Sequence, residues 1–316
     1  MENAPPAGSP AAARPVAPPP PAVEAFGLAK RYGRGALALE GIDLAVPIGS
    51  ITALVGPNGS GKSTLIKAWV GFERPTRGSV RVAGIDPWVD RGAALANVGY
   101  IPQRSFLYRS LTVSDHLDLA ATFRPGFDRP HAEERLRQLR IGPHRLVGEL
   151  SGGEHAQVAL AMILGTNAPI LLLDEPLASL DPLARREFLH VLRQSVRETG
   201  RTVVMSSHVV TDVAQACDRI VVLGSAHKLL DDWIDGAVRT HRIVAGGRAE
   251  GDRHVGSFLD LDGRMLSLVA TAGSVTGEPG AARPEAPEGA IDRPATLEEV
   301  VLGYLAAGRP GRGIEA

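Results

Sequence analysis

The sequence has a single cysteine, Cys217, so the chain cannot form an internal disulfide. This cysteine content is typical of proteins from a reducing compartment. It also lacks any hydrophobic run approaching the ~18 residues of a membrane-spanning helix. The opening stretch "MENAPPAGSPAAARPVAPPPP" has no apolar core of the kind found in signal peptides. An excess of charge is missing too, and a formal net charge of -1 argues against a broad electrostatic grip on nucleic acid or anionic lipid. Together these absences favour a cytoplasmic protein.

What is present is an ordinary globular composition, with 44% hydrophobic and 22% charged residues. Residues 1–22 are rich in proline and alanine and are expected to form a disordered tail. Residues 23–235 alternate strand-like and helix-like patterns, which predicts an α/β domain built around a mostly parallel sheet. The clearest predicted elements are strands at 50–55, 170–173 and 202–205 and a helix at 62–70.

Two regions depart from this alternation. Between about 104 and 165 only helical periodicity is found, which predicts an inserted α-helical subdomain. Residues 236–316 are expected to form a small C-terminal extension, with a β-hairpin over 258–270 around Asp262-Gly263, a flexible linker over 274–295 and a terminal helix. Thr296 and Glu299 should form a capping box that starts this helix, which is too short to be stable alone. It must therefore dock, either on its own domain or on another subunit.

The stretch "GPNGSGKST" matches the phosphate-binding pattern G-x-x-x-x-G-K-[ST] and lies between a predicted strand and a predicted helix. Its glycines let backbone N–H groups turn toward phosphate oxygens at a helix start. The lysine can reach the β- and γ-phosphates, and the following serine can bind Mg²⁺. A chance glycine turn is the alternative, and the correct flanking elements oppose it. The expected nucleotide-binding residues here are Gly56, Pro57, Asn58, Gly59, Ser60, Gly61, Lys62, Ser63 and Thr64.

Polar side chains also follow several predicted strands, where ligand sites of open α/β sheets lie. Asp174 and Glu175 follow "ILLL", and they can hold Mg²⁺ through water and polarise an attacking water, respectively. His208 follows "TVVMSS", and Gln103 follows "VGYIP". Tyr32 could stack on a base. Taken singly, an acidic turn after a strand is as often structural as functional, and a lone histidine is more often structural.

These residues, in this order, resemble the ATP-binding subunits of ABC transporters over about Phe26 to Leu230. "RYG" resembles the A-loop, "GPNGSGKST" the Walker A motif, "IPQ" the Q-loop and "LSGGE" the signature motif. "ILLLDEP" resembles Walker B, "SLD" (179–181) the D-loop and "SSH" (206–208) the switch histidine. The resemblance implies a P-loop NTPase core with an added antiparallel β subdomain. It also implies that ATP and Mg²⁺ are bound.

The resemblance assigns a role to each motif residue. Glu175, His208 and Gln103 are expected to serve ATP hydrolysis, and Ser63, Gln103 and Asp174 to hold Mg²⁺. Two subunits of this family pair head to tail, so Ser151, Gly152 and Gly153 are expected to bind the γ-phosphate of ATP held by the partner. Tyr32 and Asp181 complete the implied nucleotide site.

One departure from the family pattern lies at Glu154, where glutamine is usual. Ser151-x-x-Glu154 is also a capping-box pattern, which favours a helix-capping role, while an added charge beside phosphate could weaken closure. The basic residues usual after the motif are also missing, with His155, Ala156 and Gln157 in their place.

The leading hypothesis is the ATPase subunit of a transporter, working as a homodimer or pseudo-dimer on a separate membrane permease and therefore peripheral to the inner face of the membrane. Export is favoured, because the terminal "LEEVVLGYL" and "LDEPLASLDPLARREFLHVL" resemble ATPases of ABC-2-type exporters. A soluble ABC-type ATPase acting on DNA or ribosomes is the alternative, but no inserted coiled coil, tandem domain or basic charge supports nucleic-acid binding. A P-loop kinase would not explain the signature motif.

Overall fold

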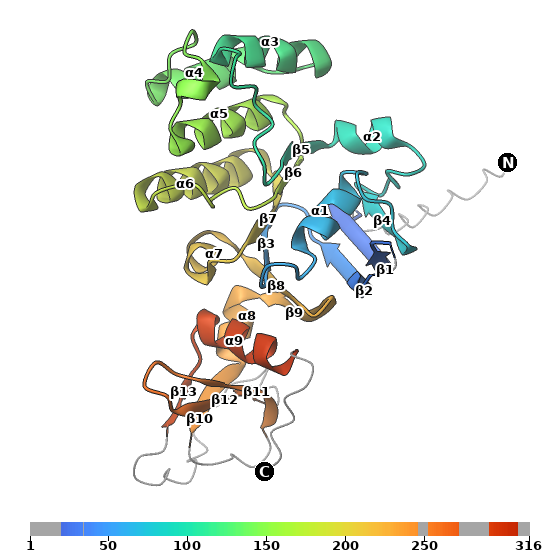
Figure 1. The fold of residues 1–316 in the computed structure, drawn as a ribbon, viewed down its shortest axis with the longest axis vertical. Helices are drawn as coiled ribbons and strands as arrows, with labels where there is room; N and C mark the ends of the chain where they lie inside the picture. The colour runs from blue at the N-terminus through green and yellow to red at the C-terminus, as the bar shows by residue number, and fades with distance from the viewer. Residues whose placement is uncertain (1–19, 34, 246–251, 272–290, 309–316) are drawn as a thin grey trace, which may run out of the picture.

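A computed structural model describes residues 20–33, 35–245, 252–271 and 291–308 of the chain. Its strands form three sheets, of six, three and four strands, and its helices stack beside them in an elongated molecule (Figure 1). No helix within the described ranges is long and apolar enough to cross a membrane.

The six-stranded sheet is the centre of the fold. Its strand order is β5-β6-β7-β3-β8-β9, and every neighbouring pair is parallel except the last, in which β9 runs antiparallel to β8. The strands β3, β6 and β7 are buried along their whole lengths. Their apolar sequences are typical of strands that are covered on both faces of a sheet. The bounds are β5 Val98–Ile101, β6 Ile170–Leu173, β7 Thr202–Ser207, β3 Ile51–Val55, β8 Arg219–Gly224 and β9 His227–Trp233.

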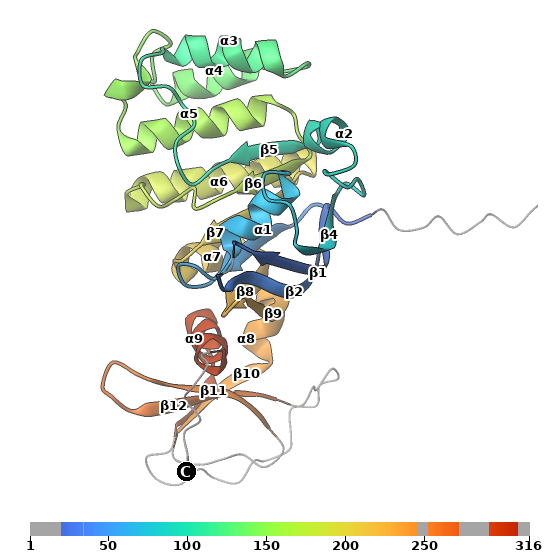
Figure 2. The same ribbon diagram turned by 45° about the vertical axis from the view of Figure 1, so that its right-hand side comes forward.

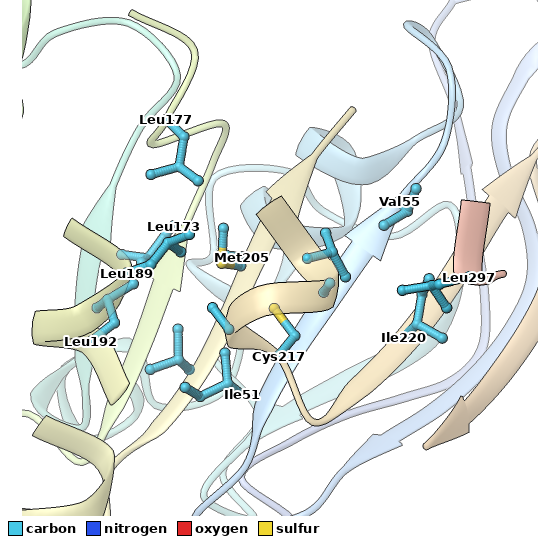
Figure 3. Packing of buried hydrophobic residues seen from close by; sticks show 14 of the residues in the cluster. Ile51, Val55, Leu173, Leu177, Leu189, Leu192, Met205, Cys217, Ile220 and Leu297 are labelled. Carbon is cyan, nitrogen blue, oxygen red and sulfur yellow. The ribbon is translucent and has the colours of Figure 1, made fainter. Parts of the chain in front are cut away.

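Helices cover both faces of this sheet. On one face, α6 (Pro182–Thr199) and α7 (Val210–Ala216) contribute to a core that includes Leu189, Leu192 and Met205 (Figure 3). On the other face, α1 (Lys62–Trp69) packs Leu65 and Trp69 into a second core. That core is closed by the antiparallel sheet β2-β1-β4, and α2 (Arg91–Ala96) follows it in the chain. Its strands are β1 Val23–Arg31, β2 Leu37–Val46 and β4 Arg77–Val82.

The helical layer lies beyond the β5 edge of the central sheet (Figure 1). It contains α3 (Val113–Phe123), α4 (Arg129–Gln138), a short 3-10 turn at Val147–Glu149 and α5 (Gly152–Gly165), around a small apolar core of its own. With the parallel central sheet and the antiparallel sheet, this layer confirms the predicted fold class.

The C-terminal part forms the third sheet, of order β11-β12-β10-β13. The predicted hairpin is confirmed, because Leu259 pairs with Met265 across a turn in which Gly263 has φ +78°. The elements are α8 Ile234–Arg239, β10 His241–Ala245, β11 Arg253–Leu259, β12 Met265–Ala270, β13 Ile291–Pro294 and α9 Leu297–Ala307.

Two boundaries differ from the sequence-based expectation. Most of the linker expected over 274–295 lies outside the described residues, but its end, Ile291–Pro294, is the strand β13 and pairs with β10. The reason is a partner far away in sequence, since Ile243 pairs with Arg293. Residues 1–19 of the expected tail also lie outside the described residues, whereas Ala22 is buried and its N–H donates to the Val46 carbonyl.

The terminal helix α9 docks on its own chain. Its predicted capping box is present, with the Thr296 hydroxyl and the Glu299 carboxylate each accepting from the other's backbone N–H. The apolar stripe packs into the same core as the central sheet, and the helix lies between that sheet and β11–β12 (Figure 2). A Cβ at Gly303 would lie 2.5 Å from the Leu268 side chain, so the helix sits directly on β12. The own-domain docking mode is therefore the one observed.

Deleting residues 296–316 is expected to lower the melting temperature of the isolated chain. Leu297, Val300 and Val301 are buried, and each such side chain contributes ~1.5–3 kcal/mol. Each kcal/mol of lost unfolding free energy lowers the melting temperature by about 2–4 °C for a large domain. The matched control is Leu302→Ala, which truncates an apolar side chain of the same helix that is 41% exposed, and it should leave the melting temperature nearly unchanged. A melting temperature of the truncated chain equal to that of the full chain would contradict this docking role.

Candidate active site

The loop between β3 and α1 is shaped by two glycines, Gly56 and Gly61, that no other residue could replace without a clash. Gly61 has φ +102°, and a Cβ there would lie 2.5 Å from the Ala38 carbonyl oxygen. A Cβ at Gly56 would lie 2.1 Å from the Leu223 carbonyl oxygen at the end of β8. The loop therefore lies tightly against the sheet edge, with its backbone wrapped around the start of α1.

Lys62, the first residue of α1, is buried and points back into this loop. Its Nζ donates to the carbonyl oxygens of Gly56 (2.8 Å) and Pro57 (3.2 Å). The same ammonium lies 3.6 Å from Oε1 of Glu175. A buried cation held by loop carbonyls and one carboxylate is poised to exchange these partners for phosphate oxygens.

Asp174, at the end of β6, is fully buried beside the loop. Its Oδ1 accepts from the hydroxyls of Ser63 (2.9 Å) and Ser206 (2.8 Å), while its Oδ2 is buried with no hydrogen-bond partner. A free carboxylate oxygen next to a serine hydroxyl is the oxygen donor set that Mg²⁺ prefers. The residues present therefore fit Mg²⁺ bound by Ser63 and Asp174.

Glu175 and His208 form a pair at the same edge. The Glu175 side chain is 7% exposed, and its Oε2 lies 2.8 Å from Nδ1 of His208, which follows β7. Glu175 has φ +52°, a conformation that L-residues rarely adopt, and its backbone N–H donates to the Ser206 hydroxyl (2.7 Å). A backbone held in this sparsely populated region beside a buried carboxylate is typical of active sites.

Ser206 is the residue that sequence reasoning missed. It joins the two acidic residues, because its hydroxyl accepts from Glu175 and donates to Asp174. The only signal was its place two residues before His208, at the end of a buried strand. That signal gains meaning only when β6 and β7 are known to be neighbours.

A cleft of about 360 Å³ lies beside these groups; Lys62, Ser63 and Glu175 line it, whereas Asp174, Ser206 and His208 do not. Gln103 and Glu175 line it together with residues 58–64 of the loop. Tyr32 lies at its mouth, 46% exposed, with its hydroxyl 3.4 Å from Oγ1 of Thr64. Partial burial is the main cause that raises the pKa of Tyr32, so its phenol is neutral at physiological pH. The cleft thus offers an exposed aromatic ring at one end and a phosphate loop at the other.

The structure does not bring the second glycine-rich helix start into this cleft. Ser151 is the exposed N-cap of α5, and Gly152 follows it close to Ser179, since a Cβ on Gly152 would lie 3.0 Å from the Ser179 carbonyl oxygen. Asp181 is also outside the cleft and caps α6 by accepting from the N–H groups of Leu183 and Ala184. Within one chain, these residues therefore have no nucleotide to contact.

The capping role expected of Glu154 is confirmed. Its Oε2 accepts from the Ser151 N–H (2.9 Å), and the Ser151 hydroxyl accepts from the Glu154 N–H (3.2 Å). Its carboxylate also forms an ion pair with Arg145. The hydrogen bond from the Arg145 guanidinium is the main cause that lowers the pKa of Glu154 to about 2, and the hydrogen bond from the Ser151 N–H is the second. The charge of Glu154 is therefore already compensated within the chain.

Comparison with known proteins supplies the family. Residues 39–178 match the family model described as ABC transporter. Over these residues the chain is similar to the ATPase domains of ABC transporters. The match begins in β2 and includes the phosphate loop, the signature motif and the acidic pair after β6.

Curated relatives of this ATPase domain include both import and multidrug proteins. The sulfate/thiosulfate import ATP-binding protein of Mesorhizobium japonicum is 36% identical over 195 residues, which are 59% of this chain and 56% of the relative. The probable multidrug ABC transporter ATP-binding protein of Escherichia coli is 36% identical over 209 residues, which are 64% of this chain and 36% of the relative. The chain thus spans little more than half of the first relative's length.

Solved structures agree on the fold of the ATPase domain. An ATP-binding subunit of an ABC transporter superimposes with a TM-score of 0.62 at 28% identity, over 69% of this chain and 92% of the other. A dimeric ATP-binding cassette in a post-hydrolysis state, bound to ADP and Pi, superimposes with a TM-score of 0.60 at 27% identity, over 67% of this chain and 98% of the other.

Proposed function

We propose that this chain is the ATP-hydrolysing subunit of an ABC transporter, acting as a pair of ATPase subunits on a separate integral-membrane permease at the inner face of the membrane. The observation that carries the proposal is the hydrogen-bonded set at the edge of the central sheet. There hydrogen bonds join each residue to the next in the order Ser63, Asp174, Ser206, Glu175 and His208. Lys62 lies beside Glu175.

In the proposed reaction, Lys62 exchanges its carbonyl partners for the β- and γ-phosphate oxygens of ATP. Glu175 accepts a proton from the attacking water as the new O–P bond forms at the γ-phosphorus and the bond to the β–γ bridging oxygen breaks, giving ADP and inorganic phosphate. His208 holds the Glu175 carboxylate in place through Nδ1. Mg²⁺, bound by Ser63 and Asp174 with Gln103 nearby, would neutralise charge on the phosphate oxygens.

The same proposal explains the exposed helix start at Ser151. The Ser151 hydroxyl accepts from Glu154, so its own hydrogen is free to donate, and the dipole of α5 favours an anion there. Since no phosphate loop of the same chain faces it, the ligand must come from a second ATPase subunit. Ser151, Gly152 and Gly153 would then close the ATP cleft of that subunit, with Asp181 at the same junction.

The direction of transport is a separate part of the proposal. Export rests on the resemblance of the segments after Asp174 and at the C-terminus to exporter ATPases. The comparisons do not add support, because the first relatives are named as import proteins while the multidrug relative matches with the same 36% identity. Once a permease is reconstituted, ATP added outside inside-out vesicles should drive cargo inward if the system exports, and should not do so if it imports.

The test of the function uses the full chain. Purified protein should hydrolyse Mg-ATP with a rate that rises more steeply than linearly with protein concentration, because the active species is a pair. Association with membranes should depend on one permease, and that permease should change the ATPase rate. A protein that hydrolyses ATP but never associates with a membrane protein would instead favour a non-transport ATPase. Absence of Mg-ATP hydrolysis would reject the function.

A further inference from the structure

A second cleft, of about 410 Å³, lies between α4 of the helical layer and α6 of the central layer, and shares no lining residue with the ATP cleft. Two arginines line it, Arg135 from α4 and Arg201 immediately before β7. It therefore spans the junction at which the helical layer meets the sheet. The charges of these two arginines set it apart from an ordinary interhelical groove.

Arg201 is buried, at 8% exposure, and every partner of its guanidinium is neutral. Its Nη2 donates to the Leu164 carbonyl (3.1 Å) and to Asn167 Oδ1 (3.0 Å), and its Nη1 has only a long contact of 3.4 Å to the Ser195 hydroxyl. Burial lowers the pKa of Arg201, which reflects the cost of holding this charge out of water. The Nη1 side still has capacity for a stronger acceptor.

Arg135 is in a similar position on the opposite wall. Its Nη2 donates to the amide oxygen of Gln157, while its Nε is buried with no partner. Burial lowers the pKa of Arg135 to about 10, although Glu187 on α6 acts in the opposite direction. Within the described ranges, no carboxylate lies within 4.0 Å of either guanidinium. Two arginines thus line one cleft without a carboxylate at ion-pair distance in the described part of the chain.

The acidic residues of this cleft are occupied elsewhere. Asp128 caps α4 by accepting from the His131 N–H (3.0 Å). Glu134 is paired with Arg137 and accepts from Gln138, and Glu198 accepts from the Gln194 amide (2.8 Å). Glu134 and Glu198 are exposed at the rim, where water screens them. None of these three acids forms an ion pair with either arginine.

We propose that this α4–α6 cleft binds a small oxyanion, the carboxylate or phosphate group of a small molecule, between the guanidinium groups of Arg135 and Arg201. Such a group matches the planar donor fork of arginine. Because the two arginines come from different layers, the bound anion would tie α4 to the central sheet. It would act as an effector site separate from the ATP site.

The test measures anion binding by titration calorimetry in the full chain carrying Lys62→Ala, which removes the phosphate loop's own lysine. The probes are inorganic phosphate, sulfate and acetate, which separate phosphate-like from carboxylate ligands, each up to about 10 mM. At least one should bind saturably at one site per chain. Adding Arg135→Gln should weaken that binding by about tenfold or more.

The matched control is Arg186→Gln, which removes one positive charge from α6, on the other side of the cleft. Arg186 is exposed and does not line the cleft. Its loss should leave anion binding unchanged. If Arg135→Gln does not fold, Arg135→Lys keeps the charge but not the fork and should still weaken binding. No saturable binding of any probe, or equal loss with Arg186→Gln, would overturn the proposal. Neither result touches the proposed ATPase function, because that is read from Mg-ATP turnover.

Discussion

Replacing Glu175 by glutamine is expected to reduce ATP hydrolysis by ~10²–10⁴-fold, the contribution of a well-placed general base, while ATP binding is kept. Glutamine has the same shape, so the unusual backbone at φ +52° and the contact to His208 can persist. The amide cannot accept a proton from water. It also removes the negative charge that lies 3.6 Å from the Lys62 ammonium, which frees that ammonium for phosphate.

The measurement is single-turnover ATPase kinetics together with nucleotide affinity. Glu187→Gln is the matched control, because Glu187 is an exposed acid on α6 outside the ATP cleft, and its loss should leave turnover unchanged. The Glu175→Gln protein should also accumulate as an ATP-bound dimer in size-exclusion chromatography. Wild-type turnover in this variant would remove Glu175 from the role of base.

Mixing two inactive variants is expected to restore activity. Lys62→Ala disables the phosphate loop, and Ser151→Arg places a bulky cation on the exposed start of α5. In a mixed dimer with shared sites, one composite site carries both defects and the other carries neither. Random pairing in a one-to-one mixture leaves about a quarter of the wild-type number of composite sites intact, so about a quarter of the activity should return.

The control for this experiment is the stability of each variant. Ser151 is the N-cap of α5, so losing its hydroxyl costs the helix about 1 kcal/mol, and thermal melts must show that the protein is still folded. ATP binding to the isolated Ser151→Arg chain should be normal, because Ser151 does not line the chain's own cleft. No recovery of activity in mixtures that demonstrably contain mixed dimers would refute the shared site.

Local sequence patterns were sufficient wherever neighbouring residues determine the structure. The turn at Gly56–Gly61, the buried run "ILLL" and the capping boxes at Ser151 and Thr296 are all specified within a few residues, and the structure has each of them. The polar residues placed at strand ends do share one sheet edge, because parallel strands bring their carboxyl ends together.

Features that depend on distant partners could not be predicted in the same way. The strand "IDRP" (291–294) has no alternating pattern and contains proline, and it is a strand only because β10 lies beside it. Ser206 links Asp174 to Glu175 only through the pairing of β6 with β7. The two arginines of the α4–α6 cleft are 66 residues apart, calculated as 201 − 135, and no local pattern relates them.

The position of β3 in the central sheet also bears on how the protein emerges from the ribosome. Ile51 pairs with Val203 in β7, and Thr52 pairs with Arg219 in β8, so both neighbours of the strand that carries the phosphate loop are made long after it. The loop is synthesised long before the carbonyl of Leu223 that abuts Gly56. Nascent chains stalled before β8 should therefore fail to bind ATP, and the apolar strand 51–55 must stay unpaired throughout that interval.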